Sequence, residues 1–315
     1  MTLRPSSYDV YPAAVELERA WRALVADAGG REQVAGWSVQ GRPLWRFDLG
    51  CADESAPTLF LTALLHGVEV IGSMALLEAV RVLVSGTTAA SSLLQRCRLV
   101  VMPIANPDAF AGNMDRLERG HLAGQRKNAR RVDLNRNFPP VGTVRPRHPF
   151  AGSRLLWSPH HRGPHALSEP ESMALAAVAT AVRPQVALGF HSFGNMLLYP
   201  WGHKRAANPR ATHYQHLARA FSEGLRGTPY RCGQSIDFYP TAGDLDDWLD
   251  DQFGTLALTV EVGALDRRLL HPSRLFNAFC WMNPSDVEGT IKNVAPAVLG
   301  LLEDACPEAR HQLVA

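Results

Sequence analysis

The sequence lacks an excess of charge of one sign. Its 315 residues include 32 lysines and arginines and 30 aspartates and glutamates, which leaves a net charge of +2. This balance gives no reason to expect a nucleic acid or an anionic membrane as the partner. The hydrophobic fraction of 46% and the charged fraction of 20% exclude disorder as the main state of the chain.

Disulfide frameworks, targeting segments and serine-hydrolase motifs are also missing. No Cys-x-x-Cys pair occurs, and the odd number of well-separated cysteines favours a reduced protein. The first residues form no apolar secretory segment, and the longest apolar stretches, 59–65 and 71–84, are too short or too interrupted to cross a bilayer. No Gly-x-Ser-x-Gly motif is present, which argues against a serine hydrolase. We therefore expect a cytoplasmic protein without a membrane partner.

Apolar runs alternate with segments of helical periodicity, which predicts an α/β protein with a mostly parallel central sheet. No linker rich in Gly, Pro or Ser divides the chain, so we expect one domain over residues 1–315, with its core at about 30–305. The segment 139–166 is irregular and is expected to be a long surface loop. The predicted strands are 33–38, 44–49, 58–65, 98–104, 186–190 and 256–262, and the predicted helices are 13–27, 74–84, 168–182, 213–225 and 285–304.

Local signals mark helix ends. The sequence SEPE at 168–171 has the pattern of a capping box with proline near the helix start. In the segment 239–248, Asp244 or Asp246 suits the N-cap of a helix that follows a surface turn. Pro296 predicts a bend in the last helix.

Polar residues follow the ends of the buried strands, where α/β sheets bind ligands: His66, Glu69, Asn106, His191 and Glu261. Two histidines and one glutamate form a three-ligand set that leaves a fourth position open, as in catalytic zinc sites. The alternatives are a core histidine bonded to a backbone carbonyl and a solvated glutamate at a helix start. Glu261 is expected either in a buried ion pair or as the general base that takes a proton from metal-bound water.

The segment 116–147 carries nine basic residues against Glu118 and Asp133. A solvated loop and a phosphate-binding patch are two explanations. A carboxylate anchor at Asn135 and Arg136 explains the pattern better, because guanidinium binds carboxylate in a bidentate fork.

Together these segments resemble the zinc carboxypeptidase family, the carboxypeptidase A-like metallopeptidases. The resemblance extends in order from residue 40 to residue 263. Its stretches are LLHGVE (64–69), MPIANPDAF (102–110), RKNARRVDLNRNFP (126–139), GPHALSEPES (163–172), GFHSFGNMLLYPWG (189–202), YPTAGDLDDW (239–248) and LTVEVG (258–263).

The resemblance implies one α/β domain with a mixed, mostly parallel, twisted eight-stranded sheet flanked by helices. It also implies one Zn²⁺ per chain, bound by His66, Glu69 and His191. Asp133 matches the carboxylate that orients the first histidine. Glu261 matches the general acid/base that acts on a zinc-activated water.

The resemblance also assigns substrate contacts. Arg126 matches the arginine that polarises the scissile carbonyl and stabilises its oxyanion. Asn135 and Arg136 match the clamp on the C-terminal carboxylate of the substrate, and Tyr239 matches the loop tyrosine that closes over it. Asp246 lies where the family reads the terminal side chain, and an acid there favours Lys, Arg or the amino end of diaminopimelate.

The implied activity is that of a zinc metallocarboxypeptidase, a hydrolase that releases the C-terminal residue of a peptide with a free carboxylate. Val68 departs from the pattern, because many digestive members carry arginine there. The secreted members carry signal and pro-segments, and neither is visible here, so an intracellular role similar to that of bacterial murein peptide amidases is expected. The alternatives are a zinc amidase or deacylase acting on N-acyl amino acids and a catalytically silent binding module.

Three further histidines, His160, His161 and His165, could form a second metal site. No carboxylate or cysteine accompanies them at ligand spacing, so the sequence favours plain exposed histidines. The sequence carries no information on the oligomeric state.

Overall fold

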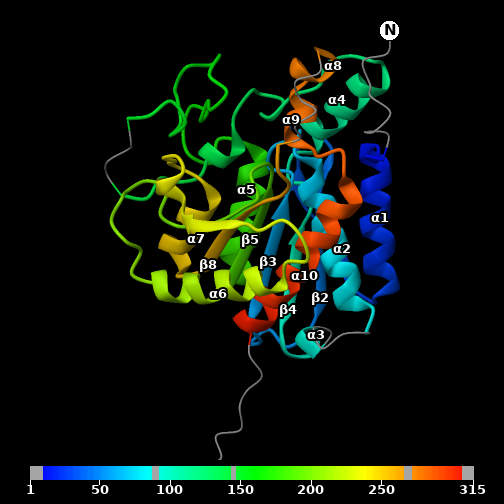
Figure 1. Ribbon diagram of the computed structural model, residues 1–315, viewed down its shortest axis with the longest axis vertical. Helices are drawn as coiled ribbons and strands as arrows, with labels where there is room; N and C mark the ends of the chain where they lie inside the picture. Colours follow the sequence, from blue (N-terminus) through cyan, green and yellow to red (C-terminus); the bar gives the residue numbers. More distant parts are fainter. Residues whose placement is uncertain (1–9, 87–91, 143–146, 266–271, 307–315) are drawn as a thin grey trace, which may run out of the picture.

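The computed structural model describes residues 10–86, 92–142, 147–265 and 272–306. Its core is a twisted sheet of eight strands between two layers of helices (Figure 1). The strands are β1 (Arg31–Trp37), β2 (Pro43–Gly50), β3 (Thr58–Ala63), β4 (Arg98–Met102), β5 (Val186–His191), β6 (Met196–Tyr199), β7 (Arg231–Gln234) and β8 (Leu256–Glu261). The expected α/β fold with a mixed eight-stranded sheet is confirmed.

The helices vary in length from one turn to five. The α-helices are α1 (Ala14–Asp27), α2 (Val70–Val84), α3 (Leu93–Arg96), α4 (Pro107–Glu118), α5 (Pro170–Val182), α6 (Ala211–Gly224), α7 (Leu245–Phe253), α8 (Pro272–Leu275), α9 (Ala278–Met282) and α10 (Val287–Ala305). The 3₁₀ turns η3 (Leu134–Arg136) and η4 (Ser235–Asp237) lie in connecting segments of the described residues.

The strand order is β1-β2-β4-β3-β5-β8-β6-β7. The four central strands β4, β3, β5 and β8 run parallel to one another. Strand β2 is antiparallel to its neighbours β1 and β4, and β6 is antiparallel to β8. Every residue of β3 and β5 is buried, as expected for strands covered on both faces. The carboxyl ends of these strands therefore meet at one edge of the sheet.

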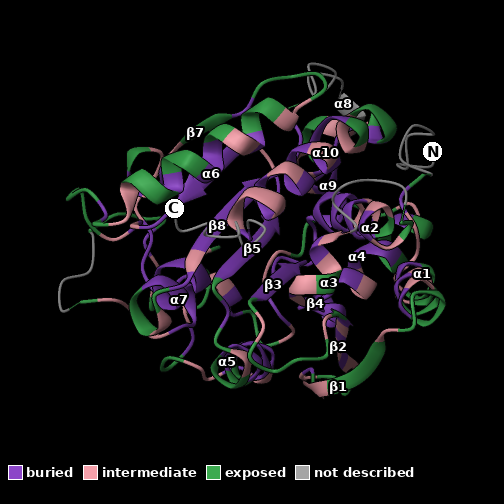
Figure 2. Ribbon diagram, turned by 90° about the horizontal axis from the view of Figure 1, so that it is seen from below, coloured by how far each residue is buried: buried purple, intermediate pink, exposed green. Residues whose placement is uncertain are grey.

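Helices cover both faces of the sheet (Figure 2). One face packs on α1, α2, α6 and α10, and the other on α5 and α7. Successive β3 residues divide between the two cores, since Leu59 and Leu61 belong to one and Phe60 to the other. Helix α1 is part of the first core, because Trp21 is fully buried and stacks on Phe47 with ring centroids 6.1 Å apart.

Several predicted boundaries shift. The strand predicted over 58–65 ends at Ala63, because Leu64 adopts a φ of 54° that breaks the extended backbone. The helix predicted from residue 74 begins at Val70, directly after the turn that carries Glu69.

The predicted capping box is wrong. The N-cap of α5 is Glu169, whose side chain makes no capping hydrogen bond, although Pro170 occupies the first turn as predicted. The Ser168 hydroxyl donates instead to Glu169 Oε1, 2.8 Å away. The predicted N-cap Asp244 is confirmed, since its side chain accepts from the Asp247 amide at the start of α7.

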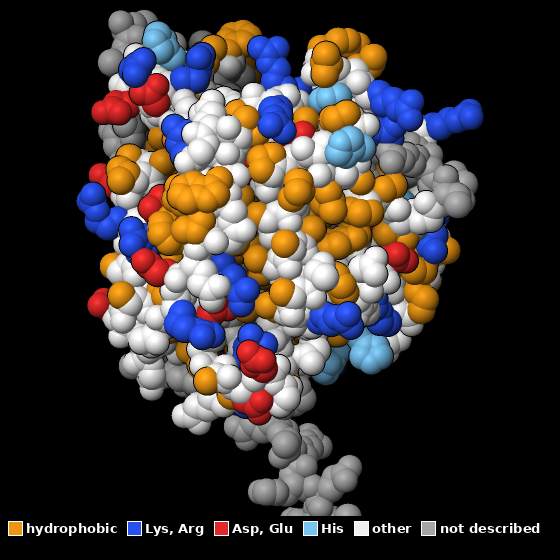
Figure 3. Space-filling model, turned by 180° about the vertical axis from the view of Figure 1, so that it is seen from behind, with side chains coloured by type: hydrophobic (Ala, Val, Ile, Leu, Met, Phe, Trp, Pro, Cys, Tyr) orange, Lys and Arg blue, Asp and Glu red, His pale blue; other side chains and the backbone are white. Residues whose placement is uncertain are grey.

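The charge distribution on the surface and the hydropathy of the helices concern two classes of partner, nucleic acids and membranes. On the face that Figure 3 shows, cationic and anionic side chains are interspersed around a central apolar area, and neither sign forms a continuous patch. Within the described residues, no helix is both long and apolar enough to span a membrane.

Candidate active site

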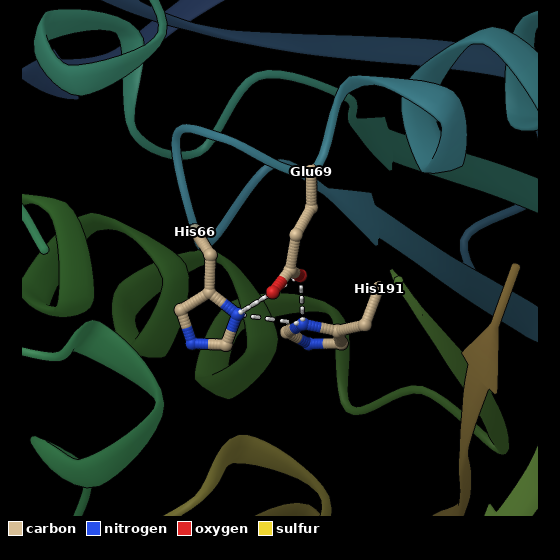
Figure 4. Close-up of side chains that lie close together, drawn as sticks. All are labelled: His66, Glu69 and His191. Atoms are coloured by element: carbon tan, nitrogen blue, oxygen red, sulfur yellow. Dashed lines mark hydrogen bonds and ion pairs between the residues drawn. The ribbon is translucent and has the colours of Figure 1, made fainter. Parts of the chain in front are cut away.

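Two histidines and a glutamate from separate segments converge at the carboxyl edge of the sheet (Figure 4). His66 and Glu69 lie on the turn between β3 and α2, and His191 ends β5. His66 Nδ1 lies 3.0 Å from His191 Nδ1, and each of these nitrogens lies 2.9 Å from Glu69 Oε2. All three side chains are buried.

This donor set fits a zinc ion. Tetrahedral zinc with ligand distances of about 2.0 Å separates neighbouring ligand atoms by roughly 3.3 Å, close to the spacing found here. Two imidazole nitrogens that face each other at 3.0 Å also gain from a shared cation. Three protein ligands leave the fourth position for water or substrate, as in catalytic sites.

Electrostatics keep the glutamate ionised. Burial opposes the ionisation of Glu69, but the facing imidazoles of His66 and His191 outweigh it and hold the pKa of Glu69 below its ordinary value. Arg126 Nη1, 3.1 Å from Glu69 Oε1, adds a further donor. The Glu69 carboxylate is therefore anionic, as a metal ligand requires.

Asp133 organises the opposite side of His66. Its Oδ1 lies 3.1 Å from His66 Nε2 and accepts from the Asn135 amide. Its Oδ2 lies 3.3 Å from both Arg126 Nε and His160 Nδ1. Burial raises the pKa of Asp133, but the Arg126 charge and the two histidines reverse the effect and hold it well below the ordinary value.

Glu261 ends β8 in register with His191 and also faces the site. Its carboxylate is not in the buried ion pair that the sequence left open, because no arginine contacts it among the described residues. Burial raises the pKa of Glu261 to about 7, and the charge of Glu69 adds to the rise, whereas His191 and Arg126 oppose it. A carboxyl group with such a pKa can exchange a proton near neutral pH.

One cavity of about 320 Å³ joins these groups. The proposed substrate residues Asn135, Arg136, Tyr239 and Asp246 all line it. Arg136 Nε donates to the Phe150 carbonyl at 2.7 Å, and Nη1 donates to the Asn135 carbonyl at 2.6 Å. These bonds fix the guanidinium and leave Nη2 without a partner among the described residues.

Tyr239 and Asp246 have perturbed acidities. Burial and the charge of Glu261 raise the pKa of the Tyr239 phenol, so this hydroxyl is a neutral donor. Asp246 is buried, and its Oδ2 accepts from the Thr259 hydroxyl. Burial raises the pKa of Asp246 to about 7, and the charge of Asp244 contributes to the rise.

Among the cavity residues that the sequence did not indicate are His160, Phe150 and Asp244. His160 was expected to be an exposed histidine, but it lines the cavity and contacts Asp133. Phe150 also lines the cavity, with its ring centroid 5.1 Å from that of His160. Asp244 was recognised only as an N-cap. Contacts between segments that are far apart in the sequence bring all three residues to the cavity. The sequence offers a signal for Asp244 alone, because it lies two positions from Asp246.

The other predicted candidates have different surroundings. His161 is buried and His165 is exposed, so these two and His160 do not share one environment. Among the described residues, the only cluster suited to a metal is that of His66, Glu69 and His191. Asn106 caps α4 by accepting from the Ala109 amide, which explains a polar residue at the end of β4.

Known proteins and a family model match most of this chain. Residues 19–280 match the sequence model of the family described as zinc carboxypeptidase. A carboxypeptidase B of Astacus astacus is 28% identical over 72% of this chain and 77% of its own length. Human carboxypeptidase B is 27% identical over 87% of this chain and 68% of its own length.

Solved structures share the fold. Carboxypeptidase A from Helicoverpa armigera has a TM-score of 0.77 at 23% identity, covering 95% of this chain and 74% of its own. Thrombin activatable fibrinolysis inhibitor has a TM-score of 0.76 at 18% identity, covering 96% of this chain and 76% of its own. At these identities the likeness establishes the fold alone.

Proposed function

The chain belongs to the zinc carboxypeptidase family and is a zinc-dependent hydrolase, and we propose that it releases the C-terminal residue of a peptide that ends in a free carboxylate. The observation that carries the proposal is the single cavity that joins the candidate metal ligands to Glu261 and to the carboxylate-binding residues Asn135 and Arg136. We further propose a preference for a basic terminal residue, because Asp246 lines the same cavity.

His66, Glu69 and His191 would hold the zinc ion, and Asp133 would fix the orientation of His66 through Nε2. Bound zinc supplies Lewis acidity, which lowers the pKa of a water molecule in the site to about 7 and polarises a carbonyl oxygen. Glu261 takes the proton of the attacking water on its carboxylate. It then delivers this proton to the nitrogen of the leaving residue.

Arg126 faces the developing negative charge. Its Nη1 and Nε are held by Glu69 and Asp133, so the guanidinium is fixed before the substrate arrives. A donor held in place in a cavity that excludes water stabilises an oxyanion without having to reorganise. Arg126 is therefore proposed to stabilise the tetrahedral oxyanion.

Recognition of the terminal carboxylate separates this activity from cleavage at internal peptide bonds. Arg136 Nη2 and the side-chain nitrogen Nδ2 of Asn135 have no hydrogen-bond partner among the described residues, so they are the donors proposed to bind it. The Tyr239 hydroxyl would add a third donor. Because Arg136 is nearly fully buried at 3% exposure, pairing with an anionic ligand is favoured.

The alternative functions differ in what lies upstream of the carboxylate. An N-acyl amino acid also presents a free carboxylate and an amide, and it would use the same metal and acid/base groups. A diaminopimelate-terminated peptide could place its far ammonium beside Asp246. The odd number of widely spaced cysteines, with no Cys-x-x-Cys pair, favours a reducing compartment, so we also propose a cytoplasmic location.

Paired peptides test the proposal. The zinc-loaded protein is given peptides of one sequence that end in either a free carboxylate or a carboxamide, together with N-acetyl amino acids. Release of the last residue from the free-carboxylate member alone supports a carboxypeptidase. Hydrolysis of N-acetyl amino acids without cleavage of any peptide would replace it with the deacylase.

A further inference from the structure

Two aspartates, rather than one, line the part of the cavity formed by the start of α7. Asp244 and Asp246 both belong to its wall, beside the apolar side chains of Met196 and Leu198. Asp244 is only 7% exposed. Its Oδ1 accepts from the Asp247 amide at 2.9 Å, but its Oδ2 is buried and has no hydrogen-bond partner. The family resemblance of the sequence implied a role in recognising the terminal side chain for Asp246 and not for Asp244.

Asp246 is also incompletely satisfied. Its Oδ2 accepts from the Thr259 hydroxyl, and its Oδ1 has no partner among the described residues. Within the part of the chain that the structure describes, no lysine, arginine or histidine forms an ion pair with either carboxylate. Arg126 and Arg136 line the same cavity, but Arg126 is held by Glu69 and Asp133 and Arg136 by two backbone carbonyls, so neither is paired with these two carboxylates.

Two carboxylates in a buried cavity repel each other strongly, because solvent screens them poorly. The charge of Asp244 raises the pKa of both Asp246 and Asp247, which is the expected sign of this repulsion. Proteins rarely leave buried carboxylate oxygens without partners unless a ligand supplies the missing donors. A positively charged side chain in the cavity would supply both donors and charge.

We propose that Asp244 is a second specificity-determining residue, which makes the cavity select a terminal side chain that is purely cationic, as in lysine or arginine. This inference rests on the proposed carboxypeptidase function and decides between two of its substrates. The far end of diaminopimelate carries an ammonium and a carboxylate on the same carbon. A cavity with one acid accepts that ammonium, whereas a cavity with two acids repels the carboxylate beside it.

The test removes the charge of Asp244 and keeps its shape. Asp244→Asn retains the N-cap of α7, because asparagine caps helices as well as aspartate. Asp244→Ser, which also retains a capping oxygen, serves as a second variant. The matched control is Asp251→Asn, which removes the same charge from an exposed position of the same helix. Peptides identical except for a terminal Arg, Lys, Leu or diaminopimelate are compared.

Loss of a hydrogen bond to a charged group predicts that kcat/KM for terminal Arg and Lys falls about tenfold in Asp244→Asn. Terminal Leu should be cleaved as in the wild type or faster, the ratio of diaminopimelate to Lys should rise, and Asp251→Asn should change none of these. An equal loss for Arg and Leu, or no change for any peptide, overturns the role of Asp244 and leaves the carboxypeptidase intact.

A binding measurement separates this inference from the proposed function. Calorimetric titration of the zinc-loaded protein with free lysine, arginine, leucine and diaminopimelate requires no turnover. If no peptide is hydrolysed, the proposed function fails. If the wild type still binds lysine and arginine more tightly than diaminopimelate and Asp244→Asn abolishes this preference, the result supports the selective cavity. Equal binding of all four amino acids by the wild type would overturn it.

Discussion

Nε2 of His66 lies 3.1 Å from Oδ1 of Asp133. Because Asp133 is an ionised acceptor, this contact places the proton of His66 on Nε2 and leaves the lone pair of Nδ1 for a metal. Asp133 has four donors, two on each oxygen, which arrive from His66, Asn135, Arg126 and His160. The orientation of one candidate metal ligand, His66, thus depends on segments up to 94 residues away from it, counted from His66 to His160.

Replacing Asp133 should weaken zinc binding. In Asp133→Asn the amide can present a donor to His66 Nε2, which removes the reason for the proton to stay there. Loss of such a partner costs about 10- to 100-fold in metal affinity. Competition with a chelator measures this affinity in the apo-protein without any substrate. An affinity equal to that of the wild type would show that Asp133 does not orient the ligand.

His160 should contribute to zinc affinity, because its Nδ1 donates to Asp133, which orients His66. Removal of this donor in His160→Ala is expected to lower zinc affinity by about tenfold, at the low end of effects for groups that support a metal ligand. His160→Asn keeps a nitrogen donor at a similar distance from the backbone and should retain most of the affinity. Equal losses in both variants would mean that the ring fills space against Phe150 rather than holding Asp133.

Arg136 should be needed for its fork as well as its charge. Arg136→Lys keeps the positive charge. A single ammonium group cannot donate hydrogen bonds to the carbonyls of Phe150 and Asn135 and also present a fixed donor to a carboxylate. We expect kcat/KM for free-carboxylate peptides to fall by about 10- to 100-fold, the effect of losing one or two charge-assisted hydrogen bonds.

The matched control for that variant is Arg119→Lys, at an exposed arginine paired with Asp115 on α4. It should leave kcat/KM unchanged. A wild-type rate in Arg136→Lys would contradict the assignment of Arg136 as the carboxylate clamp.

Gly67 should be intolerant of a side chain. A Cβ at this position would lie 2.3 Å from Ala109 Cβ and 2.6 Å from the Phe110 nitrogen, so the turn that carries His66 and Glu69 would have to move. Gly67→Ala is expected to lower the free energy of unfolding by about 1–3 kcal/mol, as overpacking does. Thermal unfolding of the metal-free protein measures the change.

Gly112 in α4 provides the opposite case. A Cβ there meets only Gln125 Oε1, at an ordinary 3.5 Å. Gly112→Ala should therefore stabilise the protein by about 0.5–1 kcal/mol, because alanine favours the helix. A Gly67→Ala variant as stable as the wild type would contradict the packing described around Gly67, and a destabilised Gly112→Ala variant would contradict the open surroundings of Gly112.

The sequence predicted the central sheet better than its surroundings. The apolar runs at β3, β4, β5 and β8 are long and uninterrupted, so their strands could be located to within about two residues, and their polar ends indicated where ligands bind. The short strands β6 and β7, the latter partly exposed, and helix α4 lacked such patterns and were not predicted.

The candidate site divides in the same way. His66, Glu69, His191 and Glu261 follow strand ends, so local sequence brought attention to them. The contact of His160 with Asp133 joins residues 27 positions apart through an irregular loop, which no periodicity predicts. The unpartnered Oδ2 of Asp244 depends on how α7 meets the cavity wall, and tertiary packing alone determines that.

The most direct test of the account is hydrolysis of a free-carboxylate peptide by the zinc-loaded wild type and by Glu261→Gln, with the zinc content of both measured. Glutamine keeps the size of the side chain but cannot exchange the proton. If Glu261 is the general acid/base, we expect the Glu261→Gln variant to bind zinc fully and its kcat to fall by about 10²- to 10⁴-fold, the usual contribution of such a group. A kcat within threefold of the wild type at full zinc occupancy would contradict this role of Glu261.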